Sequence, residues 1–440
     1  MKVLVIGSVY PRFHEDAEVP WLRASIDHLK KTGVEIQVLA PSYKGLKSHD
    51  IDGTRVNRFR YAPANWEILT HEEGAPSKMA SKPWLQLLAI PYIINGFIQC
   101  IRICRKWKPD VIHAHWPFPH AYIALGAAKL FKIPLALNFH GAELLLIRKK
   151  KWVKPFLKFA IGQAQAVFAN SSFTASKIKA IRDVNVEWSP YGTTLETRDN
   201  RRETKDESGS TNSTGTSTSS PTMCHPERTL ERSDKGESKD PVTVSPHAVN
   251  GKFKILFVGR HIERKGITYL IEAAKYLPAD KFEIRIVGVG DLTEQLHVIA
   301  NEVKQSNPDS AEIIFTGKLS PEDLANEYRT ANVFTLPAIV DSKGDTEGLG
   351  VVLIEAMELG LPIVASNVGG IPNVVVDGVS GILVQEKDPV ALANAFKQLA
   401  KDPSLVEKLL IGARKRINEC FTWDGIIERQ VEVYKRIART

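Results

Sequence analysis

Short runs of consecutive apolar, often β-branched residues alternate along this chain with segments whose apolar residues recur at helical spacing. In the first half the runs are KVLVIG from Lys2, VEIQVLA from Val34, DVIHAH from Asp110, PLALNFHG from Pro134 and AVFANS from Ala166. In the second half they are FKILFVGR from Phe253, FEIRIVGVG from Phe282, EIIFTGKL from Glu312, VFTLPA from Val333, PIVAS from Pro362 and GILV from Gly381. Strands that are apolar throughout, separated by helices, are typical of parallel sheets covered on both faces. The pattern therefore predicts an α/β protein with two Rossmann-like domains.

Two domains also suit the length of 440 residues, which is too long for one ordinary hydrophobic core. We place the first domain at 1–194 and the second at 251–420, and we expect the last helical segment, 421–440, to pack back on the first domain. The stretch 195–250 consists largely of Ser, Thr, Asp, Glu, Lys and Pro. Such a segment buries too little apolar surface to offset its ordering entropy, so we predict a disordered insertion between the domains.

Composition narrows the functional classes. A hydrophobic content of 43% with 25% charged residues is that of a soluble globular protein. The net charge of +8 favours anionic partners, but no nucleic-acid-binding signature accompanies it, so we expect no nucleic acid. The spacing of Cys100, Cys104, Cys224 and Cys420 fits neither a zinc site nor a disulfide framework, which favours the reducing cytoplasm. The first apolar run ends at Pro11 and predicts a β-strand rather than a signal peptide.

Two segments bear on membrane contact. The stretch 84–104 carries no charge before Arg102 and is about as long as a membrane-spanning helix, but Pro91 and Gly96 interrupt it. We therefore predict a helix that covers a sheet rather than a membrane span. The run RKKKWVKPFLK at 148–158 mixes cations with apolar residues, as does a surface that rests on anionic lipid, although a solvated face has the same composition. These segments allow peripheral contact with the inner face of the cell membrane.

The segment DTEGLGVVLIEA, at 345–356, places Glu347 and Glu355 eight positions apart on either side of a glycine-bracketed helix start. Backbone N–H groups at a helix start lack intrahelical partners and favour an anion. These groups belong to Gly348, Leu349 and Gly350. A nucleotide diphosphate sugar has hydroxylated rings at both ends, which suit carboxylates, and a diphosphate between them, which suits N–H donors. Alternatively, Glu347 is an ordinary helix-start acid and Glu355 a solvated glutamate.

Cations and glycines follow the other predicted strands of the second half. Gly259 and Arg260 end the strand KILFVG, and Lys265 lies in the next turn, so two cations reach a diphosphate without a metal ion, unless they are ordinary surface cations. In VGVGDLTEQL, Gly290 allows a ligand to approach the backbone closely, but the six-residue dinucleotide fingerprint is missing, which disfavours a nicotinamide dehydrogenase. Leu319, after EIIFTGK, offers an edge for a nucleobase or simply a strand exit.

The motifs VGRHIERKGI, FTGKLS, EGLGVVLIEAMELGLPIVAS, GGIP and GILV follow in this order between 258 and 384. They resemble the nucleotide-binding domain of retaining glycosyltransferases of family 4, the group 1 glycosyl transferases. The resemblance covers essentially the whole chain outside the insertion and is strongest in the second half. It implies the GT-B fold, in which two Rossmann-like domains face each other across a cleft.

The resemblance also implies roles for residues. Arg260 and Lys265 bind the donor diphosphate, Glu355 holds the ribose diol, and Glu347 contacts the transferred sugar. His140, in NFHGAE, contacts the donor sugar or leaving group, or is a structural histidine; of the pair in DVIHAHW, His115 borders the cleft and His113 is structural. The first loop, YPRFHEDAEVPWL, lacks the family's Gly-Gly pair. The predicted site residues are Glu347, His140, Arg260 and Lys265 as catalytic, Gly259, Gly290, Leu319, Gly348, Leu349, Gly350 and Glu355 as donor-binding, and His14, Asp16 and His115 on the acceptor side.

By this resemblance the chain is expected to move a sugar from a nucleotide diphosphate donor to a hydroxyl acceptor, with retention of the anomeric configuration. The acceptor is expected to be a carbohydrate or lipid-linked, in polysaccharide or glycolipid biosynthesis, and no metal or cofactor is expected. Two alternatives stay open: an epimerase or phosphorylase-like enzyme of the same fold, and a nucleotide-sugar-binding subunit without catalysis.

Overall fold

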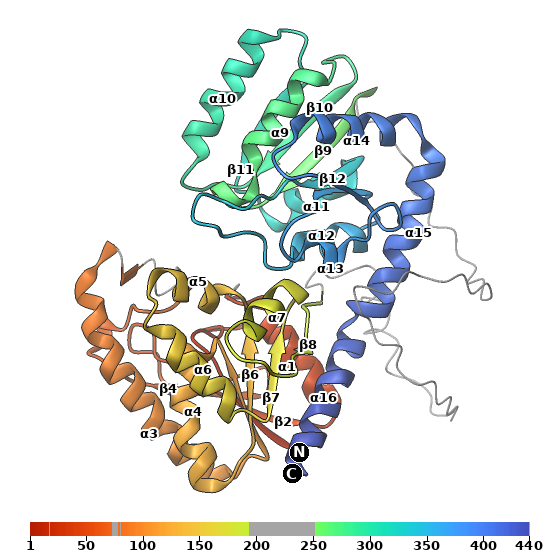
Figure 1. The fold of residues 1–440 in the computed structure, drawn as a ribbon. Helices are drawn as coiled ribbons and strands as arrows, with labels where there is room; N and C mark the ends of the chain where they lie inside the picture. Colours follow the sequence, from red (N-terminus) through yellow and green to blue (C-terminus); the bar gives the residue numbers. More distant parts are fainter. Residues whose placement is uncertain (17, 73–77, 80, 193–250, 440) are drawn as a thin grey trace, which may run out of the picture. The chain divides into compact units, whose positions relative to one another are not determined.

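The computed structural model describes residues 1–16, 18–72, 78–79, 81–192 and 251–439. The chain forms two compact units: unit 1 contains Met1–Gly192 and Trp423–Thr440, and unit 2 contains Thr193–Thr422 (Figure 1). The predicted disordered insertion at 195–250, with Cys224, lies outside the described residues.

The sheet of unit 1 has eight strands in the order β3-β4-β2-β1-β5-β6-β7-β8. Its strands are β1 (Lys2–Ile6), β2 (Glu35–Pro41), β3 (His49–Ile51), β4 (Thr54–Phe59), β5 (Val111–His115), β6 (Leu135–Phe139), β7 (Ala166–Ala169) and β8 (Glu187–Trp188). All neighbours are parallel except β3 and β4. Strands β5, β6 and β7 are buried along their whole length, which is why they read as continuous apolar runs.

Helices cover both faces of this sheet. They are α1 (Pro20–Lys31), α3 (Ala89–Trp107), α4 (Pro117–Phe131), α5 (Ala142–Lys149), α6 (Val153–Gln163), α7 (Ser172–Lys179) and α16 (Trp423–Ala438), with short 3₁₀ turns η1 (Ala64–Trp66) and η2 (Pro83–Leu88). Alternate residues of β1 lie in two different cores: Leu4 and Ile6 pack with α3, α4 and α6, whereas Val3 and Val5 pack with α1 and α16. The α/β layering predicted from the apolar runs is confirmed.

The last helix, α16, completes the second of these cores. Tyr434 of α16 is fully buried, and its hydroxyl lies 2.5 Å from Nδ1 of His113 on β5. Gly192 packs so closely on α16 that a Cβ atom there would lie 2.8 Å from the ring of Trp423. A chain segment more than 300 residues away in sequence thus belongs to the N-terminal unit.

Unit 2 contains a six-stranded, fully parallel sheet in the order β11-β10-β9-β12-β13-β14. Its strands are β9 (Phe253–Val258), β10 (Phe282–Val287), β11 (Glu312–Gly317), β12 (Val333–Leu336), β13 (Ile363–Ser366) and β14 (Ile382–Val384). Its helices are α9 (Ile267–Ala273), α10 (Thr293–Ser306), α11 (Pro321–Thr330), α12 (Val351–Glu358), α13 (Ile371–Val374), α14 (Pro389–Lys401) and α15 (Pro403–Cys420), with η4 (Glu263–Lys265) and η5 (Ala274–Tyr276). Because β9 and β12 are neighbours, the loops that follow them meet at one edge of the sheet.

The apolar stretch predicted to cover a sheet forms η2 and α3. One face of α3 lies in the core of unit 1, where Tyr92, Cys100 and Cys104 are at most 3% exposed. The segment Pro83–Trp107 is long and apolar enough to span a membrane by length and composition alone, and about a third of its apolar window is buried inside unit 1. The prediction of a core helix is therefore confirmed for one face of α3, while its other face is exposed.

Candidate functional site

In unit 2, the turn η4 after β9 is fixed to the loop after β12. The backbone N–H of Ile339 donates to the carbonyl of Arg264 over 2.9 Å, and that of Ser342 donates to the Glu263 carboxylate over 2.8 Å. The Arg264 guanidinium pairs with Asp345 at 2.5 Å. These contacts hold η4 beside the loop that leads into α12.

The arrangement brings two predicted site residues, Lys265 and Glu347, into direct contact. Lys265 Nζ lies 2.6 Å from Glu347 Oε2, and the two side chains are only 12% and 13% exposed. Burial raises the pKa of Glu347, but the charge and hydrogen bond of Lys265 outweigh it and hold that pKa below its ordinary value. Glu347 is therefore an ionised, largely buried carboxylate at a helix start, and the ammonium of Lys265 is already paired with it.

Arg260 differs from Lys265 although both follow β9. Its side chain is exposed and forms no hydrogen bond or ion pair with any residue that the structure describes. Its guanidinium is therefore available to an incoming anion without first leaving a protein partner.

Glycines permit close contacts between the loops that follow β9, β12 and β13. Gly266 has φ +65°, and a Cβ atom there would lie 1.8 Å from the carbonyl oxygen of Pro337. A Cβ atom on Gly370 would lie 2.0 Å from the carbonyl oxygen of Gly348, and the Gly370 N–H donates to the carbonyl of Glu347 over 2.9 Å. The GGIP turn thus supports the loop that presents Glu347.

Two glycines predicted to bind the donor, Gly259 and Gly290, make contacts within the protein itself. Gly290 packs against the neighbouring loop, where its Cβ atom would lie 2.5 Å from the carbonyl oxygen of His261. The N–H of Gly259 donates to the carbonyl of Val287 over 3.0 Å. The close approach that Gly290 permits in this structure is therefore between protein loops.

The start of α12 lies directly beside Glu347. Gly350 caps the helix with φ +88°, in the left-handed region. After Lys265 and Arg264, the backbone N–H of Leu349 also contributes to lowering the pKa of Glu347. Gly348 is partly exposed between them. The helix start therefore presents its backbone donors and the Glu347 carboxylate together.

Glu355, the second predicted glutamate, lies further along α12. Its surroundings differ from those of Glu347. Its carboxyl packs near Tyr328 of α11, and burial raises its pKa to about 7. Leu319 is half-buried directly after β11 and precedes Ser320, whose side chain caps α11. Of the two glutamates predicted for the donor site, Glu347 is thus ionised at neutral pH and Glu355 titrates there.

In unit 1, the predicted histidines His115 and His140 come together at the ends of β5 and β6. Nδ1 of His115 lies 3.0 Å from Nε2 of His140, and the two rings are nearly parallel. Nδ1 of His140 lies 2.6 Å from the hydroxyl of Tyr191. Burial lowers the pKa of both histidines well below the ordinary value. Both imidazoles are therefore neutral at physiological pH, and both ring nitrogens of His140 have protein partners.

Aromatic rings that the sequence analysis did not select enclose this pair. The rings of Trp21 and Trp116 each lie 4.7 Å from that of His140, and Trp21 lies 4.5 Å from Tyr191. Tyr191 follows closely after Trp188, the end of β8, and this position after the last strand of the unit was the available signal. Trp21 lies on α1, where nothing in the sequence pattern connects it with the histidines.

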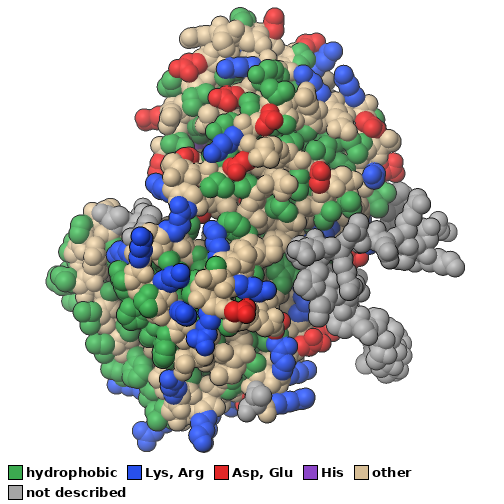
Figure 2. Space-filling view, viewed as in Figure 1, with side chains coloured by type: hydrophobic (Ala, Val, Ile, Leu, Met, Phe, Trp, Pro, Cys, Tyr) green, Lys and Arg blue, Asp and Glu red, His purple; other side chains and the backbone are tan. Residues whose placement is uncertain are grey.

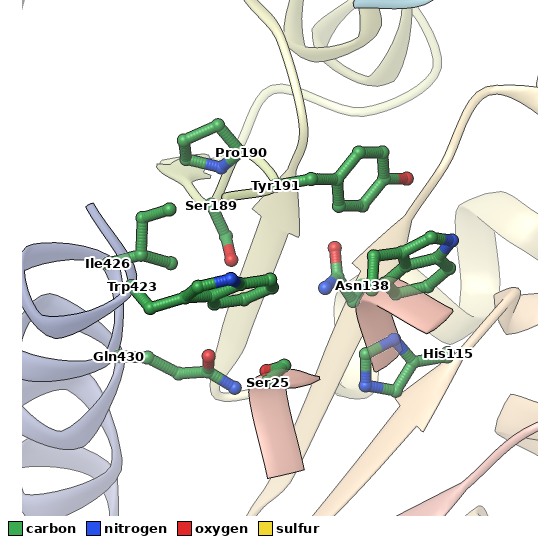
Figure 3. Close-up of a pocket in the computed structure, with 10 residues that line it drawn as sticks. Ser25, His115, Asn138, Ser189, Pro190, Tyr191, Trp423, Ile426 and Gln430 are labelled. Atoms are coloured by element: carbon green, nitrogen blue, oxygen red, sulfur yellow. The ribbon is translucent and has the colours of Figure 1, made fainter. Parts of the chain in front are cut away.

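Beside the pair lies a small pocket, shown in Figure 3. Trp423, Ile426 and Gln430 reach it from α16, opposite His115 and Asn138. Its volume of about 10 Å³ is on the order of one water molecule. The buried Oδ1 of Asn138 has no protein partner among the described residues, which suits such a water. The pocket is too small for a sugar ring.

Glu143 is a further residue that sequence reasoning missed, although it lies in the NFHGAE motif. It is in the first turn of α5, and the backbone N–H of His140 approaches its carboxylate at 3.4 Å. Burial raises its pKa to about 7. Unit 1 therefore also contains a carboxyl that titrates near neutrality.

The structure gives His14 and Asp16 local partners in the first loop. Asp16 is 7% exposed and accepts from the side chain and the backbone N–H of Arg12 at 2.7 and 2.8 Å. His14 is largely exposed, with Nδ1 2.6 Å from Oδ1 of Asp52 in the β3–β4 turn. Among the described residues, neither makes a hydrogen bond or ion pair with the His115–His140 pair. These contacts order the first loop and fix it to the sheet.

Comparison with known proteins gives the following similarities. The family description "Glycosyl transferases group 1" matches residues 243–416, and "Glycosyltransferase Family 4" matches residues 22–192. The amylovoran biosynthesis glycosyltransferase AmsK of Erwinia amylovora is 32% identical over 194 residues, which cover 43% of this chain and 46% of that protein. The matches to the first curated relatives span less than half of those proteins' length.

Solved structures are similar over almost the whole chain. Sucrose-phosphate synthase of Thermosynechococcus elongatus has a TM-score of 0.67 at 19% identity, with 99% of each chain covered. HepE of Anabaena, in complex with UDP, has a TM-score of 0.64 at 16% identity, with 99% of this chain and 100% of that chain covered. Both are GT-B proteins, so the predicted fold is confirmed.

Proposed function

Because the chain belongs to the group 1, family 4 glycosyltransferases, we propose that it transfers a hexose from a nucleotide diphosphate sugar to a hydroxyl acceptor with retention of the anomeric configuration. One observation carries this proposal. The ionised Glu347 carboxylate and the Lys265 ammonium lie 2.6 Å apart at the start of α12, and Glu355 follows on the same helix.

The cations suit the diphosphate of the donor. Arg260 offers an exposed guanidinium fork, and Lys265 has further N–H donors besides the one it gives to Glu347. The N-terminus of α12 adds backbone donors and the positive end of its dipole. Together they offset the charge that develops on the departing diphosphate, so we propose a metal-independent reaction.

The two glutamates suit the two ends of the donor. Glu347 is held beside the phosphate-binding lysine and accepts hydrogen bonds from hydroxyls of the transferred sugar. Glu355 lies eight positions further on, about 12 Å along a helical path at 1.5 Å per residue, and accepts from the ribose diol. Gly259, Gly290 and Leu319 shape the backbone around the nucleotide.

The reaction needs no covalent nucleophile in this scheme. The bond between the anomeric carbon and the diphosphate oxygen breaks, and the acceptor oxygen bonds to the same face of the sugar. The proton of the acceptor hydroxyl passes to the departing phosphate oxygen. For His140 of unit 1 we propose a contact with the donor sugar through a neutral ring, because burial holds its pKa well below the ordinary value. Its two nitrogens are bonded to His115 and Tyr191, which orient the ring.

The substrates named for similar proteins support the substrate class. HepE of Anabaena has been solved with UDP-glucose, at 16% identity, and AmsK is named for amylovoran biosynthesis. We propose a carbohydrate or lipid-linked acceptor, a role in polysaccharide or glycolipid biosynthesis, and a cytoplasmic location with peripheral contact to the membrane.

Calorimetry with UDP, GDP, ADP and their hexose conjugates tests this function on the wild type and on Arg260→Ala. Tight binding of one nucleotide series that is weakened in the variant supports the donor site, and the anomeric proton of the product, followed by NMR, tests retention. Donor consumption without an acceptor would instead favour an epimerase or phosphorylase-like enzyme. Binding without turnover over a broad acceptor panel would favour a non-catalytic subunit.

A further inference from the structure

Unit 1 exposes large apolar side chains in one region. Of the 18 exposed large hydrophobic residues among those described, 11 lie between Trp66 and Phe159, whereas all of unit 2 has six. On η2 and α3 they are Trp84, Leu87, Ile90, Ile94, Phe97 and Ile98; on α4, and on α6 with the residue before it, they are Leu130, Trp152, Phe156 and Phe159. Their spacing of three or four residues places them in stripes along α3 and α6.

These stripes belong to one layer of helices. Phe97 of α3 packs on Gly126 of α4, where a Cβ atom would lie 2.0 Å from its ring. Trp152, just before α6, contacts Phe118 of α4 edge-on at 5.8 Å. Lys129 of α4 lies over the ring of Phe159 at 5.5 Å. We call the exposed surface of α3, α4 and α6 the apolar-basic face.

Charge on this part of the chain is strongly one-sided. From Lys78 to Arg182 the sequence has 17 Lys and Arg but only two acids, Asp110 and Glu143, although the whole chain has a net charge of only +8. Glu143 is only 4% exposed. Lys151, Lys154 and Lys158 are exposed among the aromatic residues of α6. Figure 2 shows hydrophobic side chains and Lys and Arg gathered over this region of unit 1.

We propose that the apolar-basic face docks on the surface of a bilayer that contains anionic lipid. Exposed aliphatic and aromatic side chains beside lysines, with acids almost absent, are the composition of surfaces that lie at the headgroup boundary. Isolated exposed apolar residues are ordinary, but a stripe on each of two helices that both pack on α4 is not. The lysines complement anionic headgroups, whereas a second copy of this face would repel them.

The apolar-basic face lies close in sequence to the predicted site residue His140 of unit 1. The short helix α5 runs from the His140–Glu143 motif to the basic run, so its eight residues, about 12 Å at 1.5 Å per residue, separate the two. If the proposed transferase function holds, the docked face brings a lipid-linked acceptor near the site. Vesicle binding itself needs no substrate, so the failure of one proposal is distinguishable from the failure of the other.

Sedimentation of the full-length protein with vesicles tests the proposal. We expect binding to vesicles of 70% phosphatidylcholine and 30% phosphatidylglycerol, little binding to pure phosphatidylcholine, and loss of binding in 0.5 M salt. The triple variant Lys151→Gln, Lys154→Gln, Lys158→Gln should bind about 100-fold more weakly, at about fivefold per lysine. The double variant Ile90→Gln, Ile94→Gln should lose about tenfold or more through lost apolar burial.

Unit 2 offers matched controls. Lys401, Lys408 and Lys415 are exposed lysines, and Val298 and Ile411 are exposed apolar residues of helices. The corresponding Gln variants should bind vesicles like the wild type, and all variants should keep the wild-type melting temperature. Equal losses in the controls, or no wild-type binding to anionic vesicles, would overturn the proposal. A wild-type dimer that Ile94→Gln dissociates, without vesicle binding, would assign the face to a second copy and refute it too.

Discussion

The side chains at the carboxyl ends of the strands differ in charge between the two sheets. In unit 1, the ends of β5 and β6 carry neutral histidines packed among Trp21, Trp116 and Tyr191. In unit 2, the loops after β9 and β12 carry two ion pairs and an exposed arginine. A neutral, closely packed wall suits the shape of a sugar, whereas fixed charges suit a diphosphate whose charge changes during reaction. We therefore expect substitutions in unit 2 to alter diphosphate binding and departure. We expect substitutions in unit 1 to alter the positioning of the sugar.

The largest expected effect is that of Glu347→Gln in unit 2. Turnover should fall by about 10²- to 10³-fold, because the carboxylate beside the reacting sugar is lost. Nucleoside diphosphate affinity should fall far less, since Lys265 is then released from its partner. The free energy of unfolding should fall by about 2 kcal/mol because the largely buried Lys265 ammonium loses its negatively charged partner. Steady-state kinetics, calorimetry and thermal unfolding measure the three quantities.

Glu322→Gln is the matched control, because Glu322 is an exposed acid in the first turn of α11. It should leave turnover unchanged. If both variants behave alike, Glu347 is an ordinary helix-start acid, and its proposed contact with the sugar is wrong.

Arg260→Ala tests the free cation of unit 2. Nucleoside diphosphate affinity should weaken by about 2–3 kcal/mol, the scale of a charge-assisted hydrogen bond. Stability should stay within about 0.5 kcal/mol of wild type, because the guanidinium has no partner among the described residues. Arg329→Ala, on the exposed side of α11, is the control for general charge. Unchanged affinity in Arg260→Ala would remove this residue from the site.

Each unit has a carboxyl with a pKa of about 7: Glu355 in unit 2 and Glu143 in unit 1. The pH dependence of binding tests which of them contacts the donor. A nucleotide sugar, whose diphosphate does not titrate near neutrality, should bind about tenfold more tightly at pH 8 than at pH 6, since the ribose diol needs the ionised Glu355. Glu355→Gln should abolish this dependence and Glu143→Gln should not. Calorimetry at both pH values measures it; a profile that follows Glu143 would reverse the assignment.

The raised pKa of Glu355 also affects stability. Whereas donor binding should strengthen as the pH rises, the stability contribution of this carboxyl should weaken. A carboxyl whose pKa is higher in the folded than in the unfolded state binds more protons when folded between about pH 4.5 and 7. Its contribution to the free energy of unfolding therefore falls as the pH rises through that window. Glu355→Gln should make the unfolding free energy less dependent on pH there, which chemical denaturation at pH 5 and pH 7.5 measures.

The sequence carried a stronger local signal for the charged cluster of unit 2 than for the rings around His140, for a physical reason. The motif around Glu347 and Glu355 is local, because one helix start creates the donors, the carboxylate and the spacing. The contact of Glu347 with Lys265, 82 positions away, depends on β9 and β12 being neighbours, and strand order is not written in apolar periodicity. The rings around His140 come from α1, from the residue after β5 and from the segment after β8, so Trp21 carried no local signal.

Exposure was the other property that periodicity did not reveal. The stretch at 84–104 is mostly apolar and carries no charge before Arg102, and this pattern predicts burial. The structure buries Tyr92 and Cys100 but leaves Ile90 and Ile94 more than half exposed. Which side of an all-apolar helix is covered depends on the neighbours that pack on it. In α3, only one side has such neighbours within the described residues.

Tyr191→Phe is expected to have the smallest effect and tests positioning in unit 1. It removes the hydroxyl that lies 2.6 Å from Nδ1 of His140 while it keeps the ring against Trp21. Stability should fall by about 1 kcal/mol, the net value of a buried hydrogen bond. Turnover should fall only several-fold, with nucleotide affinity unchanged, because His140 is then less firmly oriented but still neutral. His140→Ala should lower turnover more, and adding Tyr191→Phe to it should have little further effect on turnover, since both act on one position. Additive losses in the double variant would mean that the tyrosine acts independently of the histidine, and the positioning role would have to be abandoned.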